Sequence, residues 1–516
     1  MNGAEAMIRT LVDAGVTTCF TNPGTSEMHF VAALDTVREM RGVLGLFEGV
    51  VTGAADGYAR MTGGPAATLL HLGPGLGNGL ANLHNARRAA TPVVNIVGDH
   101  ATYHARFDAP LHSDIDAAAR NVSGWIGRPE HTADLCRVTA EAVHAACGPP
   151  GQVATLILPA DVSWSDGAEP GTPLPRRPPA TVDCDAVDAV AKVLRSGEPV
   201  ALLLGGSALR RTPLAAAARI GAGTDARLFA ETFVARTERG AGIPGIEKLQ
   251  YFGEMAQAQL AGLRHLVLVD AGSPVSFFAY PGKPSDLVPG GCAVHVLAVP
   301  GDDAAGALDA LADIVGATDG PTAEPARPPR PGGPLTGPNL AAAIAATLPE
   351  GAIVSDESAT ASAWMAAATA GCPPHDWLQL TGGAIGQGLP VATGAAVACP
   401  ERPVISLEAD GSAMYTIQSL WTQARESLDV TTVIVNNRSY AILNIELART
   451  GAGAGGPKAR DLLDLSRPDL DFVQLAGGMG VPAVAVRTAD EAVAALEQAI
   501  AEPGPHLVEA ILEDRR

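Results

Sequence analysis

Short runs of hydrophobic residues alternate along this chain with longer stretches in which apolar and polar residues recur at helical spacing. Unbroken apolar runs predict strands buried on both faces, as in parallel sheets covered by helices. The first part of the chain contains the runs GVTTCFTNP, GVLGLFE, PAATLLHLG, PVVNIVGD and QVATLILPAD. Later runs include VALLLGG, HLVLVDAGS, CAVHVLAVP, AIVSDES, PVISLEADGS, TTVIVNNRS and HLVEAIL. The pattern predicts an α/β fold of doubly wound parallel sheets.

Two proline-rich stretches interrupt this alternation. They are AEPGTPLPRRPPAT at 168–181 and TDGPTAEPARPPRPGGPLTGP at 318–338, and neither has apolar periodicity. Such composition is typical of extended linkers. The linkers predict three α/β domains, at 1–167, 182–317 and 338–516, each large enough for its own core.

Composition narrows the class of protein. The formal net charge of −20 argues against nucleic acid or an anionic membrane as the main partner. Gly, Pro or charged residues interrupt every candidate membrane span, and the N-terminus MNGAEAMIRTLVDAG lacks a signal pattern. The seven cysteines form no CxxC pair and no metal-ligand spacing. We therefore expect a soluble, cytoplasmic protein with reduced cysteines.

Candidate chemistry is densest in the stretch EADGSAMYTIQSLWTQARESLDVTTVIVNNRSY. One strand ends at Asp410-Gly411-Ser412 and the next at Asn436-Asn437, so one crossover brings Asp410 and Asn437 to the same sheet edge. Their oxygens suit a hard divalent ion that also binds phosphate. Backbone N–H groups at the start of the intervening helix favour an anion. Together these residues predict a diphosphate bridged by Mg²⁺; the alternative is a loop Asp followed by an Asn turn.

The same stretch resembles the thiamin diphosphate motif that begins with GDG and ends with NN. The first Gly of that motif is Ala409 here, which leaves the ligands intact. The resemblance implies that Asp410, Asn437 and the backbone carbonyl of Ser439 hold Mg²⁺. It also implies that Gly411 and Ser412 contact the cofactor.

Two further segments resemble the same family. LTGGAIGQGLP resembles the loop that bends the cofactor, with Ile385 as the apolar wedge. By resemblance, Gly383 offers its carbonyl to the 4′-amino group and Ile385 its N–H to N3′. LFEGVVTGAADGYAR resembles the glutamate segment, in which the carboxyl group of Glu48 shares a proton with pyrimidine N1′. The small residues after Glu48 form a dimer interface in the family.

The three motifs occur in family order along the chain. The chain therefore resembles the acetolactate synthase, pyruvate oxidase and benzoylformate decarboxylase group. It looks nearest to the acetolactate synthase-like large subunits of actinobacteria. TNPGTSEMHF and LLHLGPGLGNGL resemble the decarboxylase pattern, which places Thr25 or Ser26 and His71 over C2 of the cofactor. A His there can orient a carboxylate or move protons.

Several positions depart from the family. The middle-domain His of the decarboxylase is absent, and Phe277, Phe278 and Tyr280 occupy that stretch. The synthase segment DAFQE reads DAPLHSD, which brings in His112 and Ser113. Asn444 and Glu446 stand where the synthases carry an Arg and a Trp that shape the acceptor pocket. No flavin signature is found, so we do not expect FAD; Gly205-Gly206 predicts a tight turn rather than a nucleotide site.

These features predict a thiamin diphosphate- and Mg²⁺-dependent enzyme that decarboxylates a small 2-keto acid. An acetolactate synthase-like enzyme would join the product to an acceptor carbonyl, whereas a benzoylformate decarboxylase-like enzyme would release an aldehyde. A non-catalytic regulatory partner of a related synthase is a further hypothesis, and an acyl-CoA lyase a weaker one. The resemblance implies a homodimer or homotetramer, with Glu48 and Asp410 from different chains in one site.

Overall fold

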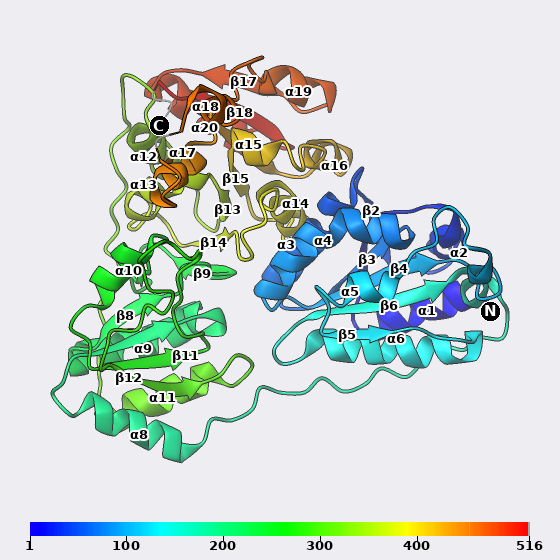
Figure 1. Cartoon of the computed structure of the whole chain (residues 1–516), viewed down its shortest axis with the longest axis horizontal. Coiled ribbons are helices and arrows are strands. Elements are labelled where there is room, and N and C mark those ends of the chain that lie inside the picture. The colour runs from blue at the N-terminus through cyan, green and yellow to red at the C-terminus, as the bar shows by residue number, and fades with distance from the viewer. Residues whose placement is uncertain (454, 514–516) are drawn as a thin grey trace.

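A computed structural model describes residues 1–453 and 455–513. Three sheets flanked by helices follow one another along the chain, and two extended segments join them (Figure 1). The expected α/β architecture is therefore confirmed. Within the described residues, no helix is long and apolar enough to cross a membrane.

The first sheet is parallel throughout, in the order β2-β1-β3-β4-β6-β5. Its apolar strands lie as predicted, and a sixth strand was not foreseen. The bounds are β1 Thr18–Asn22, β2 Arg41–Leu44, β3 Ala66–Leu70, β4 Val93–Asp99, β5 Trp125–Gly127 and β6 Val153–Pro159. The helices are α1 Gly3–Asp13, α2 Met28–Ala33, α3 Glu48–Thr62, α4 Leu72–Arg88, α5 Ile115–Ala119, α6 Thr132–Cys147 and α7 Ala160–Trp164.

The second sheet is also parallel, in the order β10-β8-β7-β11-β12. Its bounds are β7 Val200–Leu204, β8 Arg227–Ala230, β10 Glu247–Lys248, β11 His265–Val269 and β12 Ala293–Ala298. The helices are α8 Cys184–Leu194, α9 Arg211–Thr224, α10 Gly253–Leu260 and α11 Ala304–Val315.

The third sheet has the order β17-β18-β16-β15-β13-β14-β9. Its last strand, β9 (Arg236–Arg239), comes from the middle of the chain and runs antiparallel to β14. The other bounds are β13 Ile353–Glu357, β14 His375–Gln379, β15 Val404–Ala409, β16 Val430–Asn436, β17 Ala483–Val486 and β18 His506–Ile511. The helices are α12 Gly337–Thr347, α13 Ser362–Ala368, α14 Gly388–Ala398, α15 Asp410–Ala413, α16 Ser419–Arg425, α17 Ala441–Arg449, α18 Pro457–Asp461, α19 Phe472–Gly478 and α20 Ala489–Ala501.

Helices α3 and α14 join the N-terminal and C-terminal units (Figure 1). Their small residues let the two backbones touch: a Cβ on Gly57 would collide with the carbonyl of Val391, and one on Gly394 with that of Ala54. The packing explains why the sequence after Glu48 is so rich in Gly and Ala. The two helices belong to one chain, and a hydrophobic core runs continuously from one unit into the other.

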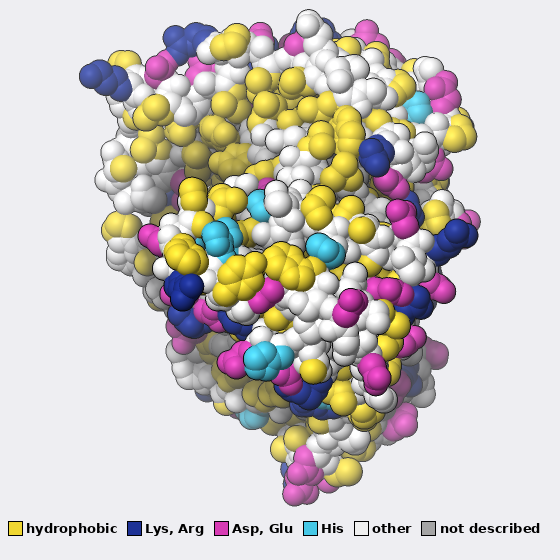
Figure 2. All heavy atoms as spheres, turned by 90° about the vertical axis from the view of Figure 1, so that its right-hand side faces the viewer, with side chains coloured by type: hydrophobic (Ala, Val, Ile, Leu, Met, Phe, Trp, Pro, Cys, Tyr) yellow, Lys and Arg dark blue, Asp and Glu magenta, His cyan; other side chains and the backbone are white. Residues whose placement is uncertain are grey.

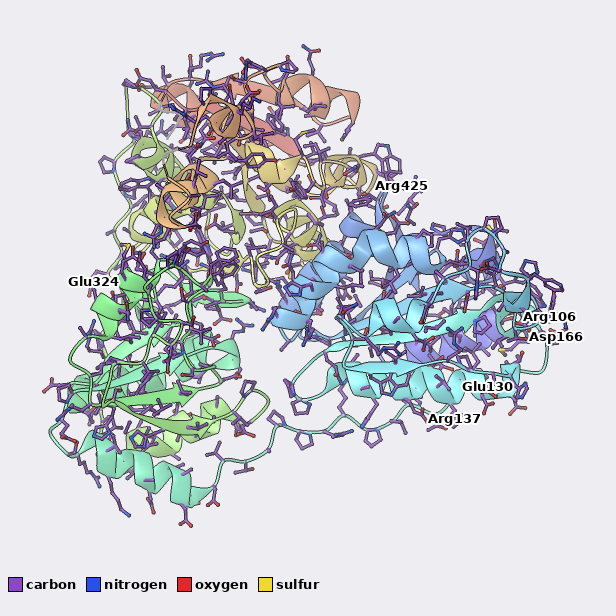
Figure 3. All side chains as sticks on the ribbon, viewed as in Figure 1. Arg106, Glu130, Arg137, Asp166, Glu324 and Arg425 are labelled. Atoms are coloured by element: carbon purple, nitrogen blue, oxygen red, sulfur yellow. The ribbon has the colours of Figure 1, made fainter. Side chains whose placement is uncertain are left out.

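A buried ion pair ties the same junction to the middle of the chain. The guanidinium of Arg60 binds the carboxylate of Asp56 at 2.6 Å, and both side chains are almost fully buried. Arg60 also donates to the carbonyls of Ala235 and Gln379. Most other charged side chains lie at the periphery, such as Arg106 and Glu130 in Figure 3.

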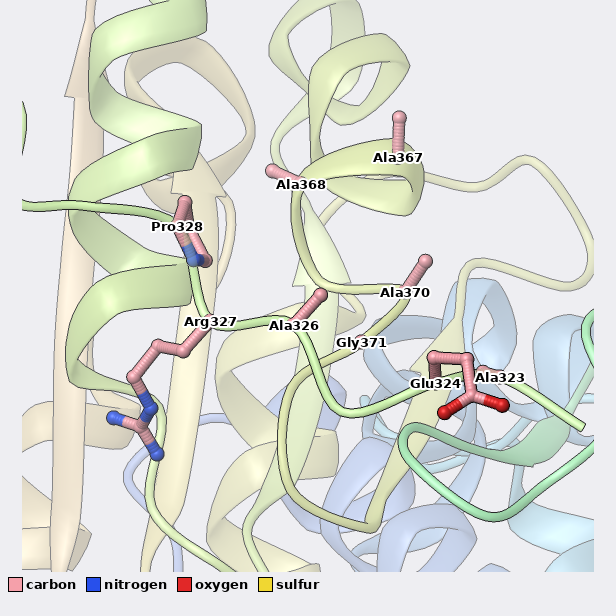
Figure 4. Close-up of a pocket in the computed structure, with 9 residues that line it drawn as sticks. All are labelled: Ala323, Glu324, Ala326, Arg327, Pro328, Ala367, Ala368, Ala370 and Gly371. Atoms are coloured by element: carbon pink, nitrogen blue, oxygen red, sulfur yellow. The ribbon is translucent and has the colours of Figure 1, made fainter.

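The second proline-rich segment lies along the third sheet unit. Ala326 forms a bridge with Gly371, and Arg327 donates to the carbonyls of Ala346 and Leu348 at the end of α12. A cavity of about 510 Å³ lies between this segment and the end of α13 (Figure 4). Small alanine side chains dominate its lining, so it offers little chemistry.

Candidate active site

Glu48 begins α3 directly after the first sheet's edge strand. The backbone of Phe47 is extended, and Glu48 is the first residue of the helix. The positive end of the helix dipole favours an acidic side chain at this position. The side chain is 7% exposed, and Oε2 accepts a hydrogen bond of 2.9 Å from Nδ2 of Asn78 on α4. The structure thus places the predicted acid in a buried position with one amide partner.

His71 lies beside Glu48, at the residue that precedes α4. A Cβ on Gly75 would stand 3.3 Å from Oε1 of Glu48 and 3.5 Å from Cβ of His71. The Glu48 carboxylate and the His71 side chain therefore both lie next to the first turn of α4. His71 therefore lies at the same sheet edge as Glu48, and its position over C2 of the cofactor stays a prediction.

Glu27 is a functional candidate that the sequence interpretation missed. Its Oε2 lies 2.8 Å from Nδ1 of His71 and accepts a second bond of 2.8 Å from the backbone N–H of Gly24. Burial raises the pKa of this fully buried carboxyl group, and the charge of His71 opposes the rise. The signal was present in TNPGTSEMHF, where the Glu closes the turn that holds Thr25 and Ser26. In that turn Thr25 is exposed and Ser26 half-buried.

The stretch DAPLHSD leads into α5, close to His71. Ser113 lies against Gly73, two residues after His71, where a Cβ would collide with the Ser113 hydroxyl. His112 and Ser113 also line a cavity of about 680 Å³ over the ends of β4, β5 and β6, together with His100 and Arg128. Figure 2 shows histidines and hydrophobic side chains together on this outward face.

Asp410 occupies the equivalent sheet edge of the C-terminal unit. Its Oδ1 accepts from the N–H of Gly411 at 2.8 Å, and Oδ2 accepts from the N–H of Arg438 at 2.6 Å. Burial raises the pKa of Asp410 to about 6, although both N–H groups lower it. The second bond joins the loops after β15 and β16, so the two predicted ligand loops do meet.

The two asparagines after β16 have different partners. Asn436 donates at 2.7 Å to Oε1 of Glu509 on β18, whereas Oδ1 of Asn437 accepts from the N–H of Ser439. Asn436 therefore bonds to the neighbouring strand β18. Asn437 bonds within the loop after β16, which is the loop that also contacts Asp410. Ser412 donates to the carbonyl of Ala409 at 3.1 Å.

These oxygens fit a hard cation better than a soft one. The described residues contain no cluster of three or more His, Cys, Asp or Glu able to hold a metal. A Mg²⁺ ion here would rely on Asp410 together with the amide of Asn437 and the carbonyl of Ser439, which are oxygen donors of the kind it prefers. A cation would also offset the cost of burying the Asp410 carboxylate.

The wedge loop, residues 382–388, connects β14 to α14. Gly383 and Gly386 have φ of +78° and +93°, a conformation that requires glycine, and Ile385 is half-buried between them. The buried carboxylate of Glu357 accepts from the N–H groups of Gly386 at 2.8 Å and Gly388 at 2.6 Å. Sequence analysis missed Glu357; its place at the end of β13 was the available signal.

An aromatic cluster covers the outer side of this loop. A Cβ on Gly383 would stand 2.5 Å from Cζ of Phe277, and the Phe277 ring lies 5.1–5.5 Å from those of Phe233 and Tyr251. Nearby, the hydroxyl of Tyr280 donates at 2.9 Å to Glu446 on α17. Phe277, from the stretch that replaces the decarboxylase His, therefore places an aromatic ring beside the predicted cofactor loop.

The Gly205-Gly206 turn is filled by the chain's own carboxylates. A Cβ on Gly205 would stand 2.6 Å from Oε2 of Glu231, and Asp270 accepts from the N–H of Ser207 at 2.7 Å. Burial raises the pKa of Glu231 to about 7. Two acidic groups at this turn are poor partners for a nucleotide phosphate.

Comparison with known proteins gives two family matches. Residues 1–119 match the thiamine pyrophosphate enzyme, N-terminal TPP binding domain, and residues 358–510 match the C-terminal TPP binding domain. The two matches contain Glu48 with His71, and Asp410 with Asn437, respectively.

Relatives extend the likeness over the whole chain. It is 63% identical over 515 residues to "Putative acetolactate synthase large subunit IlvX" of Mycobacterium tuberculosis, covering 99% of each chain. It is 30% identical over 527 residues to benzoylformate decarboxylase of Pseudomonas aeruginosa, covering 96% of each. A solved thiamine diphosphate-dependent 4-hydroxybenzoylformate decarboxylase of Rhodococcus jostii RHA1 superposes with a TM-score of 0.86 at 26% identity, over 100% of this chain and 99% of that one. The chain therefore belongs to the thiamine pyrophosphate enzymes, in the family that includes the acetolactate synthases and the benzoylformate decarboxylases.

Proposed function

We propose that this chain decarboxylates a 2-keto acid with an apolar side chain and releases the aldehyde. The observation that supports this most directly is that Glu48 and His71 both lie beside Gly75 on the first turn of α4, with His71 bound to Glu27. An acid and a base at the carboxyl edge of a parallel sheet are what proton transfer at a bound ligand needs.

Thiamin diphosphate, when bound, supplies an electron sink for the loss of CO₂. The residues Asp410, Asn437 and Ser439 would hold its diphosphate through Mg²⁺, and the wedge loop with Ile385 would bend it. Glu48 would hold a proton at N1′, and its burial keeps that proton from water. His71 would bind the substrate carboxylate. After CO₂ has left, it would deliver a proton to the carbon that carried the carboxylate.

The aromatic cluster favours an apolar substrate. Phe277 faces the wedge loop, in the stretch where the decarboxylases carry a second His, and the rings of Tyr251 and Phe233 pack against it. This wall offers contact area rather than a proton. We assign the proton transfer to His71, which Glu27 holds in place. An aryl or branched-alkyl 2-keto acid would gain most from such a wall.

We further propose that two chains complete each site. Glu48 and Asp410 lie on different units of the chain, and the cavities of about 510–760 Å³ found among the described residues are lined by other groups. A partner chain could bring its Asp410 loop to face Glu48. A homodimer is the smallest such assembly and a homotetramer a larger one; sedimentation with and without cofactor separates them.

Acetolactate formation is the second candidate. The name of the Mycobacterium tuberculosis relative favours it, because that protein is 63% identical over nearly the whole chain. The acceptor positions do not support it: Glu446 is buried and bound to Tyr280, and Asn444 donates to the hydroxyl of Ser439. A non-catalytic regulatory role is the third candidate.

A screen of CO₂ release separates the three. The purified chain with thiamin diphosphate and Mg²⁺ is offered pyruvate, 2-ketobutyrate, benzoylformate and phosphonopyruvate, and the products are identified. We expect aldehyde from benzoylformate; acetolactate from pyruvate would support the second candidate. Cofactor binding without turnover of any substrate would support the third.

The variant Glu48→Gln tests the acid itself. It should still bind thiamin diphosphate but lose turnover, because the amide cannot exchange a proton with N1′. Glu39→Gln, at an exposed position of the same domain, is the matched control and should behave as wild type. Full activity in Glu48→Gln would refute the proposed role.

A further inference from the structure

Two buried asparagines of α4 contact the wedge loop of the same chain. Asn82 is 2% exposed and Asn85 is fully buried, although amide side chains are rarely buried without partners. All their hydrogen bonds reach backbone groups next to predicted cofactor contacts, or reach each other. This N-terminal helix therefore holds a loop that belongs to the C-terminal unit.

A single amide group of Asn82 joins the start of α3 to the wedge loop of the same chain. Its Nδ2 donates to the carbonyl of Gly49 at 2.8 Å and to the carbonyl of Gly386 at 3.0 Å. Gly49 follows Glu48, and Gly386 follows Ile385. Since both carbonyls share one nitrogen, the start of α3 and the wedge loop are held a fixed distance apart.

Asn85 binds the wedge loop at Ala384, the residue before Ile385. Its Nδ2 donates to the carbonyl of Ala384 at 2.8 Å, and its Oδ1 accepts from the N–H of Ala384 at 3.3 Å. Nδ2 also donates to Oδ1 of Asn82 at 2.9 Å. With both backbone groups of Ala384 engaged, the carbonyl of Gly383 and the N–H of Ile385 remain directed to the other side of the loop.

We infer that Asn82 and Asn85 are positioning residues, an amide clasp that holds the wedge loop in place against α4 of the same chain. The inference rests on the proposed function, because the loop's task is to bend the cofactor. Apolar side chains of similar size would fill the space but would leave the carbonyls of Gly49 and Ala384 without these donors. The clasp thus fixes position as well as filling space.

Cofactor titration tests the clasp without any substrate. Thiamin diphosphate is added to the Mg²⁺-loaded full chain, and the quenching of tryptophan fluorescence gives Kd. Asn82→Ala and Asn85→Ala should each weaken binding about 10- to 100-fold, because a misplaced loop no longer matches the bent cofactor. Arg88→Ala, an exposed change on the same helix, is the control and should leave Kd unchanged.

Turnover gives the second readout. In cofactor-saturated Asn82→Ala, kcat should fall about 10²-fold while KM for the keto acid changes less than about threefold. Asn82→Ser, which keeps a small hydroxyl donor, should recover part of kcat and serves if the Ala variant does not fold. In the double variant the two losses should not multiply, because the amides bind each other.

The outcomes separate the clasp from the proposed function. If wild type binds thiamin diphosphate and Asn82→Ala and Asn85→Ala match it in Kd and kcat, the clasp is overturned and the proposed function stands. If the variants lose only thermal stability and keep Kd, kcat and KM, the asparagines are structural and the inference is again overturned. If wild type binds no thiamin diphosphate, the proposed function and the clasp are both overturned.

Discussion

The carboxylate of Glu27 binds Nδ1 of His71 at 2.8 Å, and this contact sets the orientation of the imidazole. With Nδ1 engaged in this bond, Nε2 is the nitrogen left for a ligand. The Glu27 side chain is fully buried and the His71 side chain 24% exposed, so one partner faces the core and the other the site. The pair resembles the general arrangement in which a buried acid orients a catalytic base.

Removing the charge of Glu27 should therefore impair catalysis through His71. In Glu27→Gln we expect kcat to fall about 10²-fold with little change in KM, because the ring loses its orientation and its counter-charge. The pH profile of kcat/KM should change as well. The control Glu130→Gln alters an exposed carboxylate of the same domain (Figure 3). It should leave kcat and the pH profile of kcat/KM unchanged. A wild-type profile in Glu27→Gln would contradict this role.

The adjacent asparagines after β16 offer a second test. Asn437→Ala should raise the Mg²⁺ concentration for half-maximal activity about 10- to 100-fold, because a metal ligand is lost. Asn436→Ala should instead lower the free energy of unfolding by about 1–3 kcal/mol, since Glu509 loses a buried donor at 2.7 Å. Activity titrated with Mg²⁺, and urea unfolding, are the two measurements. The same metal dependence in both variants would show that Asn437 is no ligand.

Apolar patterning predicted the sheets well, because most strands are buried on both faces. It located β1, β3, β4 and β16. The polar strand β9 was not predicted, because its sequence RTER has no apolar run and it lies antiparallel at a sheet edge. Its partner β14 lies over a hundred residues away, so only the folded chain reveals the pair.

Side-chain contacts across the fold could not be predicted in the same way. Glu27 and His71 are 44 residues apart, and they meet because β1 pairs with β3 in a particular register. Asn82 and Gly386 are 304 residues apart. Motif spacing identified Asp410 and Asn437 because one crossover separates them. That Glu48 and Asp410 of different chains share a site stays a prediction.

Stability should depend on pH through Glu231. Burial raises the pKa of this carboxyl group from 4.5 to about 7, so the folded state holds a proton that the unfolded state has released between these values. The free energy of unfolding should then fall as pH rises from about 4.5 to about 7. Glu231→Gln removes this dependence and keeps an acceptor for the N–H of Gly272. Urea titrations give the free energy of unfolding at about pH 5 and pH 8. The difference between these two free energies should be larger in wild type than in the variant by about 1–3 kcal/mol; equal differences would contradict the assignment.

Substrate choice should depend on Phe277. Its ring lies against Gly383 and is 39% exposed, so Phe277→Ala removes aromatic surface from the outer side of the wedge loop, where we propose that the substrate binds. The ratio of kcat/KM for benzoylformate to that for pyruvate should fall about 10-fold, because an apolar contact discriminates by roughly this factor. Val275→Ala, 67% exposed on the same segment, is the control and should keep the ratio. An unchanged ratio in Phe277→Ala, with cofactor Kd unaltered, would mean that the substrate binds away from this wall and that the apolar preference has another origin.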